Sequence, residues 1–342
     1  MKTILITGAA GFIGSNLAYK LYKEGNRLIL VDDFSYGREV NLKFNDIDFN
    51  EIIYRKSILD VEAMEDIFSK NKIDVVYHLA AISVLPDCQN NPIKAVDVNV
   101  KGTTVLLEMS RKYGIKNFIF ASSSAVYENN TSFPLVENNV ELPSLLYPNT
   151  KYMSEQLCKS YYDTYGLPTV CLRFTNVYGP HIDCLRKQPP VMGYIIKSFY
   201  DGDSPVLHST GEQQRDFIYI DDLLDLAILV QKNKEFDVVN ISTGQTASIN
   251  EIANIIRKQM NCENIEIKYQ SSSHYWDKYK ELSEGVYPIN KERLEHEVLK
   301  YTCLSYEHAY KKYKWEPKVS LEEGIKNTIN FSVSVLKGDS ND

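Results

Sequence analysis

The sequence predicts an α/β fold, a doubly wound parallel sheet with a smaller lobe toward the C-terminus. The first 180 residues alternate short β-branched runs with longer stretches in which apolar residues recur every three or four positions, the pattern of βαβ units. This rhythm breaks after Gly179-Pro180, and 342 residues leave room for two lobes. We expect one domain over residues 1–180 and a discontinuous second lobe over 181–336, with the chain returning to the sheet near 216–245.

Each strand expected in the first domain is a short run rich in Val, Ile, Leu and Phe. The segments between them have one apolar face and are interpreted as helices. The expected strands are residues 2–7, 27–31, 52–54, 75–79, 117–121 and 169–174. The expected helices are residues 11–23, 61–69, 92–113 and 147–165.

The second lobe has fewer and shorter apolar runs. A helix over 191–200 follows Pro189-Pro190, and Ser248 with Glu251 has the spacing of a capping box at the start of a helix over 248–260. A short strand and helix are expected within 216–231, a strand over 238–241, a loop over 271–285 and a frayed tail from Lys337.

Composition argues against several classes of protein. Lys and Arg number 38 against 45 Asp and Glu, a net charge of −7 with no basic block that would bind nucleic acid. No apolar run approaches the ~20 residues of a membrane span, and the N-terminal run is too short for a secretion signal, so a cytoplasmic location is expected. The six cysteines form no Cys-x-x-Cys pair and the six histidines have no metal-ligand spacing, so we expect reduced thiols and no metal.

A glycine-rich turn follows the first strand. Gly8, Gly11 and Gly14 follow the pattern G-x-x-G-x-x-G, which lets backbone N–H groups approach a pyrophosphate at the start of a helix. Asp32 ends the second strand, where a carboxylate accepts hydrogen bonds from both ribose hydroxyls and repels a 2′-phosphate. The pattern predicts a site for NAD rather than NADP. The alternative is an ordinary strand-turn-helix with a surface Asp.

Tyr147 and Lys151 place a phenol and an ammonium four residues apart on one face of the helix expected over 147–165. Only this pair follows a strand-end cluster of serines, Ser122-Ser123-Ser124. We therefore take Tyr147 as a candidate base, with serines that merely cap the strand as the alternative. The same Tyr-x-x-x-Lys spacing occurs at Tyr19, Tyr287 and Tyr310, so spacing alone identifies nothing.

Further motifs run along nearly the whole chain, at residues 7–14, 32–35, 60–61, 78–81, 99–103, 122–127, 147–151, 172–180, 215–217 and 315–317. Together and in this order they resemble the extended short-chain dehydrogenase/reductase family, specifically its nucleotide-sugar epimerase and dehydratase branch. The resemblance implies a Rossmann sheet, bound NAD and a nucleotide-sugar substrate. It also implies a homodimer formed by the helices expected over 92–113 and 147–165.

The resemblance also implies roles for single residues. Tyr147 would take the proton of a sugar hydroxyl as hydride leaves for the nicotinamide, with Ser123 holding the same oxygen and Lys151 helping to lower the pKa of the phenol. Lowering a pKa of ~10 by ~3 units requires ~4 kcal/mol. The implied cofactor contacts are Gly8, Gly11, Phe12, Ile13, Gly14, Asp32, Asp33, Ser35, Asp60, Val61, Ala80, Ala81, Asn99, Tyr147, Lys151 and Phe174. The implied substrate contacts are Val84, Ser123, Ser124, Asn176, Arg215, Arg293 and Thr302.

Within this resemblance, Asn176 and Arg215 match phosphate contacts, and Arg293 is the candidate for a second arginine. The family pattern R-x-G-[DE] is altered here, because Arg293 is followed by Leu294-Glu295. Thr302 falls where relatives limit the substituent at C2 of the sugar. A small Thr leaves room for an N-acetyl group, a hint of UDP-N-acetylglucosamine or UDP-N-acetylgalactosamine.

The residues after Ser123 bear on the type of reaction. Dehydratases and sugar-acid decarboxylases of this family usually carry an acidic residue there, whereas this chain has Ser124 and Ala125. The resemblance therefore favours epimerisation at C4, by oxidation to a 4-keto sugar and return of the hydride to its other face. The alternatives are a 4,6-dehydratase or 4-dehydrogenase with an acid from elsewhere, and a non-catalytic NAD-binding scaffold.

Two further residues near the expected site are interpreted as structural. His78 ends a strand beside the cofactor wall and is expected to be a packed core histidine. Cys88 falls near the substrate entrance, and we expect a packing thiol rather than an acid or base.

Overall fold

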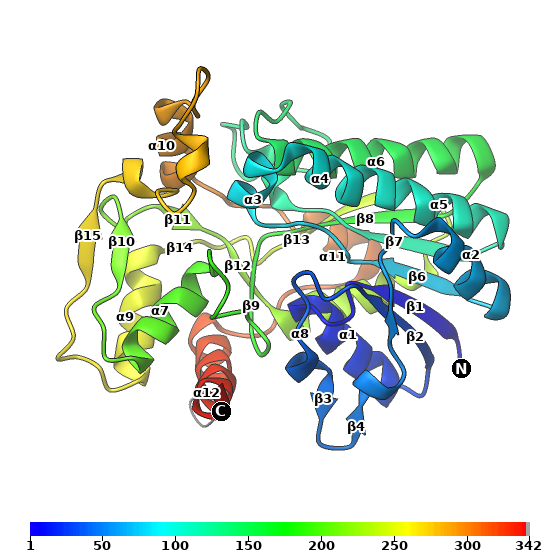
Figure 1. The fold of residues 1–342 in the computed structure, drawn as a ribbon, viewed down its shortest axis with the longest axis horizontal. Helices are drawn as coiled ribbons and strands as arrows, with labels where there is room; N and C mark the ends of the chain where they lie inside the picture. Colours follow the sequence, from blue (N-terminus) through cyan, green and yellow to red (C-terminus); the bar gives the residue numbers. More distant parts are fainter. Residues whose placement is uncertain (340–342) are drawn as a thin grey trace.

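The computed structural model describes residues 1–339 and confirms the α/β fold (Figure 1). Its centre is a seven-stranded parallel sheet in the order β13-β8-β7-β6-β1-β2-β5. The strands are β1 (Thr3–Thr7), β2 (Arg27–Asp32), β5 (Tyr54–Arg55), β6 (Val75–His78), β7 (Asn117–Ala121), β8 (Thr169–Phe174) and β13 (Asp237–Ile241).

Helices cover both faces of this sheet (Figure 1). Alternate residues of a strand point to opposite faces, so Ile4 and Ile6 of β1 join one apolar core while Leu5 joins the other. Helices α1 (Phe12–Lys23) and α8 (Ile220–Leu229) contribute to the first core. Helices α2 (Val61–Lys70), α5 (Gly102–Lys112) and α6 (Leu146–Tyr165) contribute to the second.

The strand order reverses between β1 and β6. β1 pairs with β2 on one side and with β6 on the other, so the segments that follow Thr7 and His78 leave the same edge of the sheet side by side. Ligands of open α/β sheets bind at such a reversal, outside the carboxyl ends of the strands. The topology therefore places the glycine turn where a dinucleotide would bind.

The chain beyond residue 180 adds helices and two-stranded pairs, most of them on one side of the sheet (Figure 1). β13 then pairs with β8, which brings the chain back to the sheet within the expected region near 216–245. The helices are α7 (Val191–Tyr200), α9 (Ile249–Gln259), α10 (Lys291–Leu299), α11 (Glu307–Tyr313) and α12 (Leu321–Asp339). The pairs are β9 (Asn176–Tyr178) with β12 (Phe217–Tyr219), β10 (Val206–His208) with β15 (Lys268–Gln270), and β11 (Gln214–Arg215) with β14 (Ala247–Ser248).

Most expected elements agree with the structure to within one or two residues. The helix expected over 92–113 is interrupted, because a π-helical turn at Asp97–Lys101 separates α4 (Pro92–Val96) from α5. Ser248 caps α9 by accepting a hydrogen bond from the N–H of Glu251 at 3.0 Å, as the capping spacing predicts. The sequence analysis did not anticipate α3 (Leu85–Asn90), the hairpin of β3 (Lys43–Phe44) and β4 (Ile47–Asp48), α10, α11 or α12.

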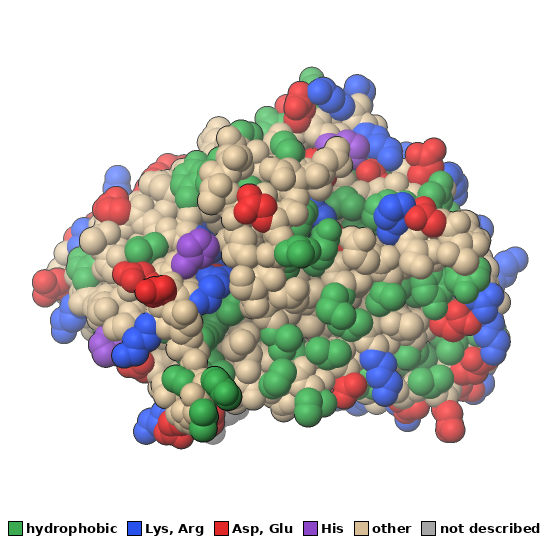
Figure 2. Space-filling model, turned by 90° about the horizontal axis from the view of Figure 1, so that it is seen from above, with side chains coloured by type: hydrophobic (Ala, Val, Ile, Leu, Met, Phe, Trp, Pro, Cys, Tyr) green, Lys and Arg blue, Asp and Glu red, His purple; other side chains and the backbone are tan. Residues whose placement is uncertain are grey.

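The segment expected to fray from Lys337 is helical as far as Asp339, and the rest of it lies outside the described residues. None of the helices within residues 1–339 is long and apolar enough to cross a membrane. Seen from above, hydrophobic side chains gather on the right-hand half of the surface, over the region of α5 and α6 (Figure 2).

Candidate functional site

The glycine turn between β1 and α1 can be built only from glycine at two positions. Gly8 has a φ of +71°, and a Cβ there would lie 2.7 Å from the backbone nitrogen of Ala80 on the neighbouring loop. A Cβ at Gly14 would overlap the carbonyl oxygen of Gly8. The turn therefore keeps its backbone bare and close to the start of α1, the geometry that suits a pyrophosphate.

A cavity of about 300 Å³ opens at this turn and reaches the serine cluster. Most of the cofactor contacts implied by the sequence line it, so the residues present fit a dinucleotide. They are Gly8, Gly11, Phe12, Ile13, Gly14, Asp32, Asp33, Ser35, Ala80, Ala81, Tyr147, Lys151 and Phe174.

Asp32 lies on the cavity wall at the end of β2. Its carboxylate accepts hydrogen bonds from the N–H of Ala10 at 2.9 Å and of Phe34 at 2.8 Å, which fix its orientation beside the glycine turn. Burial raises the pKa of the Asp32 carboxyl, and the two N–H donors oppose that rise. A buried acceptor held in this way is suited to bind ribose hydroxyls.

Two implied cofactor contacts are placed elsewhere. Asp60 caps α2 by accepting a hydrogen bond from the N–H of Ala63 at 3.0 Å, and Val61 is exposed at the first position of that helix. Neither residue lines the cavity, whose wall at this point is formed instead by Lys56 and Ile58. Asp60 therefore has a role in capping α2, and the cofactor contact expected at Asp60 and Val61 stays a prediction.

Asn99 also lies behind the cavity wall rather than on it. Its amide donates to the carbonyl of Ile82 and to the Thr150 hydroxyl, each at 3.0 Å, and accepts from the N–H of Ile82 at 2.8 Å. Asn99 belongs to the π-helical turn between α4 and α5, an irregularity common at functional sites. It therefore joins a cavity-lining segment to α6, next to Lys151.

Tyr147 lines the cavity, and the Ser123 side chain acts on its phenol, lowering the pKa of that group. Tyr147 is the second residue of α6, and Ser123 begins the turn after β7, where its hydroxyl also accepts from the N–H of Ala125 at 3.1 Å. Lys151 lies one turn further along α6 and donates from Nζ to the carbonyl of Ala121 at 2.7 Å. The three residues predicted to be catalytic are thus brought together from two elements.

Burial dominates the electrostatics of this group. It raises the pKa of the Tyr147 phenol to about 12, which the hydrogen bond with Ser123 partly opposes. It lowers the pKa of the Lys151 ammonium to about 8. The phenol is therefore protonated at neutral pH in the chain alone, and a base at this position needs a further positive charge nearby.

A buried ion pair supports the catalytic helix, and the sequence analysis missed it. Glu155 of α6 pairs with Arg173 of β8 through Oε1–Nε at 2.8 Å and Oε2–Nη2 at 2.5 Å. The Ser122 hydroxyl donates to the same carboxylate at 2.5 Å, and Arg173 donates to the phenol oxygen of Tyr127 at 2.7 Å. Glu155 shares a helix face with Lys151, the one sequence signal that points to it.

Three of the implied substrate contacts converge beside the sheet. Arg215 and Thr302 are bridge partners, and the Asn176 side chain donates to the backbone carbonyl of Asp216 at 2.9 Å. Arg215 donates to the carbonyl of Val298 at 2.8 Å, at the end of α10. None of the three lines the 300 Å³ cavity, and the same is true of Val84 and Ser124, which begin short helical turns.

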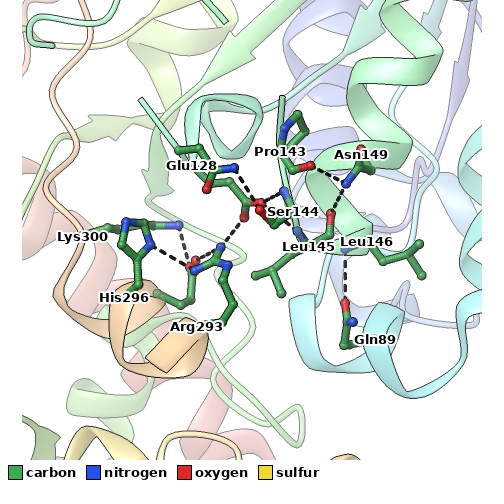
Figure 3. Close-up of polar contacts among 12 residues, drawn as sticks. Gln89, Glu128, Pro143, Ser144, Leu145, Leu146, Asn149, Arg293, His296 and Lys300 are labelled. Atoms are coloured by element: carbon green, nitrogen blue, oxygen red, sulfur yellow. Dashed lines mark hydrogen bonds and ion pairs between the residues drawn. The ribbon is translucent and has the colours of Figure 1, made fainter. Parts of the chain in front are cut away.

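Arg293 has protein partners of its own (Figure 3). Its guanidinium donates to Glu128 at 2.5 Å and lies 3.5 Å from Glu297, and its side chain is only 17% exposed. Glu128 in turn accepts from the N–H groups of Ser144 and Leu145, just before α6. For Arg293 the role of second phosphate arginine stays a prediction, and it would require a phosphate to replace Glu128.

The two residues interpreted as structural are buried and bonded within the protein. His78 contacts the hydroxyls of Thr7 and Thr103, each at 2.9 Å, and burial lowers its pKa to about 3. Cys88 donates to the carbonyl of Ile82 at 3.3 Å, and burial raises its pKa to about 12. His78 is a core histidine, as predicted, and Cys88 is a poor acid or base. All six cysteines are free.

Comparison with known proteins agrees with this geometry. Residues 4–242 match the model of the NAD dependent epimerase/dehydratase family. The chain is 31% identical to the UDP-glucuronate 4-epimerase of Thermodesulfobacterium geofontis, over 97% of this chain and 96% of that protein. It is 32% identical to the UDP-N-acetyl-alpha-D-glucosaminuronate decarboxylase of Bacillus cytotoxicus, over 96% of this chain and 97% of that protein.

A solved structure is equally similar. UDP-glucose 4-epimerase of Thermotoga maritima, crystallised with UDP-glucose, superposes with a TM-score of 0.85 at 32% identity and covers 98% of this chain and 99% of its own. Relatives with a 4,6-dehydratase name also match, so similarity alone does not select one reaction. With its glycine turn, a cavity lined by most of the expected cofactor contacts, and the match of residues 4–242, the chain belongs to the NAD-dependent epimerase/dehydratase family, within the extended short-chain dehydrogenases/reductases.

Proposed function

We propose that the chain catalyses epimerisation at C4 of a UDP-hexose or a UDP-N-acetylhexosamine through a transient 4-keto sugar. The observation that carries the proposal is Tyr147 on the wall of the cofactor cavity, with Ser123 acting on its phenol and the non-acidic Ser124 and Ala125 following Ser123. Tyr147 and Ser123 provide a proton acceptor for one sugar hydroxyl and no second acid beside it.

Tyr147 would take the proton from the C4 hydroxyl, and the Ser123 hydroxyl would hold the same oxygen by a hydrogen bond. NAD, when bound, supplies the hydride acceptor and the positive charge that the buried phenol needs. Lys151 adds its own charge to the site, while its hydrogen bond to Ala121 fixes its position. The glycine turn and Asp32 would hold the pyrophosphate and the ribose.

The carboxylates near Tyr147 favour epimerisation over dehydration. A dehydratase needs an acid free to act at the neighbouring carbon, but Glu155 is paired with Arg173 and Glu128 with Arg293. The carboxylate of Asp183, on the cavity wall, accepts from the N–H groups of Leu185 and Arg186. Each of the three is thus engaged with a donor of the protein.

The substrate would extend from Tyr147 toward the cluster of Asn176, Arg215 and Thr302. Arg215 would bind a phosphate, since its guanidinium lies half-buried with no carboxylate within 4.0 Å among residues 1–339. Thr302 is adjacent to it and would face the sugar.

The test is incubation of the purified protein with UDP-glucose, UDP-galactose and their N-acetylated counterparts, followed by chromatographic separation of the sugars. The proposal expects interconversion of one epimer pair with no net accumulation of a keto sugar. Accumulation of a 4-keto product would instead favour the dehydratase or dehydrogenase alternative. No turnover with any of these sugars, nor with the corresponding C6 acids, would favour a scaffold.

A further inference from the structure

Arg186 is a cation on the cavity wall that the sequence analysis did not single out. It lies in the loop between β9 and α7, is half-buried, and lines the same 300 Å³ cavity as Tyr147 and Lys151. Its Nε donates to the carbonyl of Gln188 at 2.7 Å. Within residues 1–339, its two terminal nitrogens have no hydrogen-bond partner and no carboxylate within 4.0 Å.

The acidic residues around Arg186 are engaged elsewhere. Asp183 accepts from backbone N–H groups, at 3.0 Å from Leu185 and 3.2 Å from Arg186 itself. Asp87 accepts from two phenols, Tyr36 at 2.7 Å and Tyr279 at 2.6 Å. Both carboxylates influence Arg186 only through space. The planar donor edge of the guanidinium is therefore left for a ligand, and that edge matches a carboxylate or a phosphate.

The position of Arg186 indicates which part of a substrate it would meet. Arg186 and Tyr147 line the same cavity, and the positive charge of Arg186 lowers the pKa of the Tyr147 phenol, against the rise that burial causes. The positive charges of Arg186 and Arg215 both lower the pKa of the Tyr275 phenol. Arg186 thus faces the same cavity as Tyr147, the reacting residue.

We propose that Arg186 is a specificity-determining residue that binds the C6 carboxylate of a hexuronate, so that the preferred substrate is a nucleoside diphosphate uronic acid. In a hexose, C6 is attached to C5, the direct neighbour of the reacting C4, so a group that contacts C6 lies beside the residue that deprotonates the C4 hydroxyl. The diphosphate is attached at C1, on the far side of the ring.

This inference rests on the proposed C4 epimerisation and replaces its neutral sugars by their C6 acids. A carboxylate would satisfy two donors of Arg186 at once in a bidentate pair. A hydroxymethyl group in the same place would leave the guanidinium without an anion. A polar site discriminates strongly against a substrate that leaves its buried groups unpaired, so Arg186 would favour the C6 acid over the C6 alcohol.

The experiment compares UDP-glucuronate with UDP-glucose, which differ only at C6. For the wild type we expect a higher kcat/KM with UDP-glucuronate. Arg186→Gln should lower that value by about 10- to 200-fold, the scale of a lost charged hydrogen bond, and should change kcat/KM for UDP-glucose less than about threefold. Arg186→Lys keeps the charge but not the planar pair of donors. Its kcat/KM with UDP-glucuronate should therefore lie between those of the wild type and Arg186→Gln.

Lys187→Gln is the matched control. Lys187 is the next residue of the loop, exposed, absent from the cavity wall, and stacked 4.0 Å over the ring of Tyr279. Lys187→Gln removes the same charge and should change kcat/KM for both substrates by less than about twofold. The inference is overturned by a wild type without preference for the acid, or by an equal loss on both sugars, which would place a phosphate at Arg186. Loss of bound NAD from Arg186→Gln would assign it to the cofactor and overturn it as well.

Binding measured by calorimetry separates this inference from the proposed function. In a Tyr147→Phe background, which prevents turnover, UDP-glucuronate should bind more tightly than UDP-glucose, and Arg186→Gln should remove the difference. If that result accompanies a wild type that forms keto sugars, the carboxylate site stands and the proposed epimerisation fails. If UDP-glucose is epimerised and the two sugars bind equally, epimerisation stands and the carboxylate site fails.

Discussion

Glu155→Gln tests whether the buried pair with Arg173 supports the catalytic helix. The two side chains are 1% and 3% exposed, so neutralising one leaves the other charged in a water-free interior. Breaking a buried pair from one side costs about 3–5 kcal/mol. The glutamine amide oxygen can still accept one of the three hydrogen bonds to Glu155, so we expect the lower end, about 3 kcal/mol in the free energy of unfolding.

The assay is equilibrium unfolding in urea, with Asp163→Asn as the control. Asp163 pairs with Lys159 on the same helix at 2.6 Å, but both side chains are about half exposed, so this change should cost less than about 1 kcal/mol. In a double-mutant cycle, Glu155→Gln with Arg173→Met should cost less than the sum of the single changes by more than about 1 kcal/mol. Equal costs for Glu155→Gln and Asp163→Asn would refute the reasoning.

Three further predictions concern the cofactor, the assembly and pH. Denaturing the purified protein should release NAD(H), and Asp32→Ala should weaken retention at least ~10-fold because it removes a charged acceptor; NADP released in place of NAD would contradict this. Ile93 and Met153, exposed at 77% and 48% on α4 and α6, should lie in a homodimer interface, so that Ile93→Asp gives a monomer mass by light scattering while the wild type gives a dimer. The rate should fall as pH rises through about 8, where Lys151 loses its proton, and a flat profile from pH 7 to 10 would exclude that role. The folded-state pKa of Lys151 lies below its ordinary value, so burying its charge lowers the free energy of unfolding by the full amount below about pH 8. As pH rises from about 8 to 10.5, this penalty disappears and the free energy of unfolding increases.

The sequence predicted the parts of the fold that repeat a local pattern. Strands 117–121 and 169–174 and helix 191–200 have the predicted bounds, because each is one apolar run between clear turn residues. The segment over 291–299 has only three buried residues, Leu294, Glu297 and Val298, so no apolar stripe in the sequence predicts α10. The π-helical turn at Asp97–Lys101 likewise follows from what Asn99 contacts, which periodicity does not show.

The candidate site was predictable where a motif specifies local geometry. The glycine turn, Asp32 and Tyr147 follow from short patterns with a physical purpose. Partners far apart in the sequence were not predictable: Arg293 contacts Glu128 across 165 positions, and Glu155 contacts Arg173 from a different element. Arg186 stands in an irregular loop, and only the folded chain brings it to the cavity that holds Tyr147.

The most direct test of the account is the epimerisation rate of Tyr147→Phe. The substitution keeps the ring and its packing but removes the proton acceptor, so the rate should fall by ~10²-fold or more while NAD stays bound. Tyr310→Phe is the matched control, since Tyr310 has the same spacing to a lysine but is 50% exposed on α11, and its rate should be unchanged. A Tyr147→Phe enzyme that kept half of the wild-type rate would contradict the assignment of Tyr147 as the base.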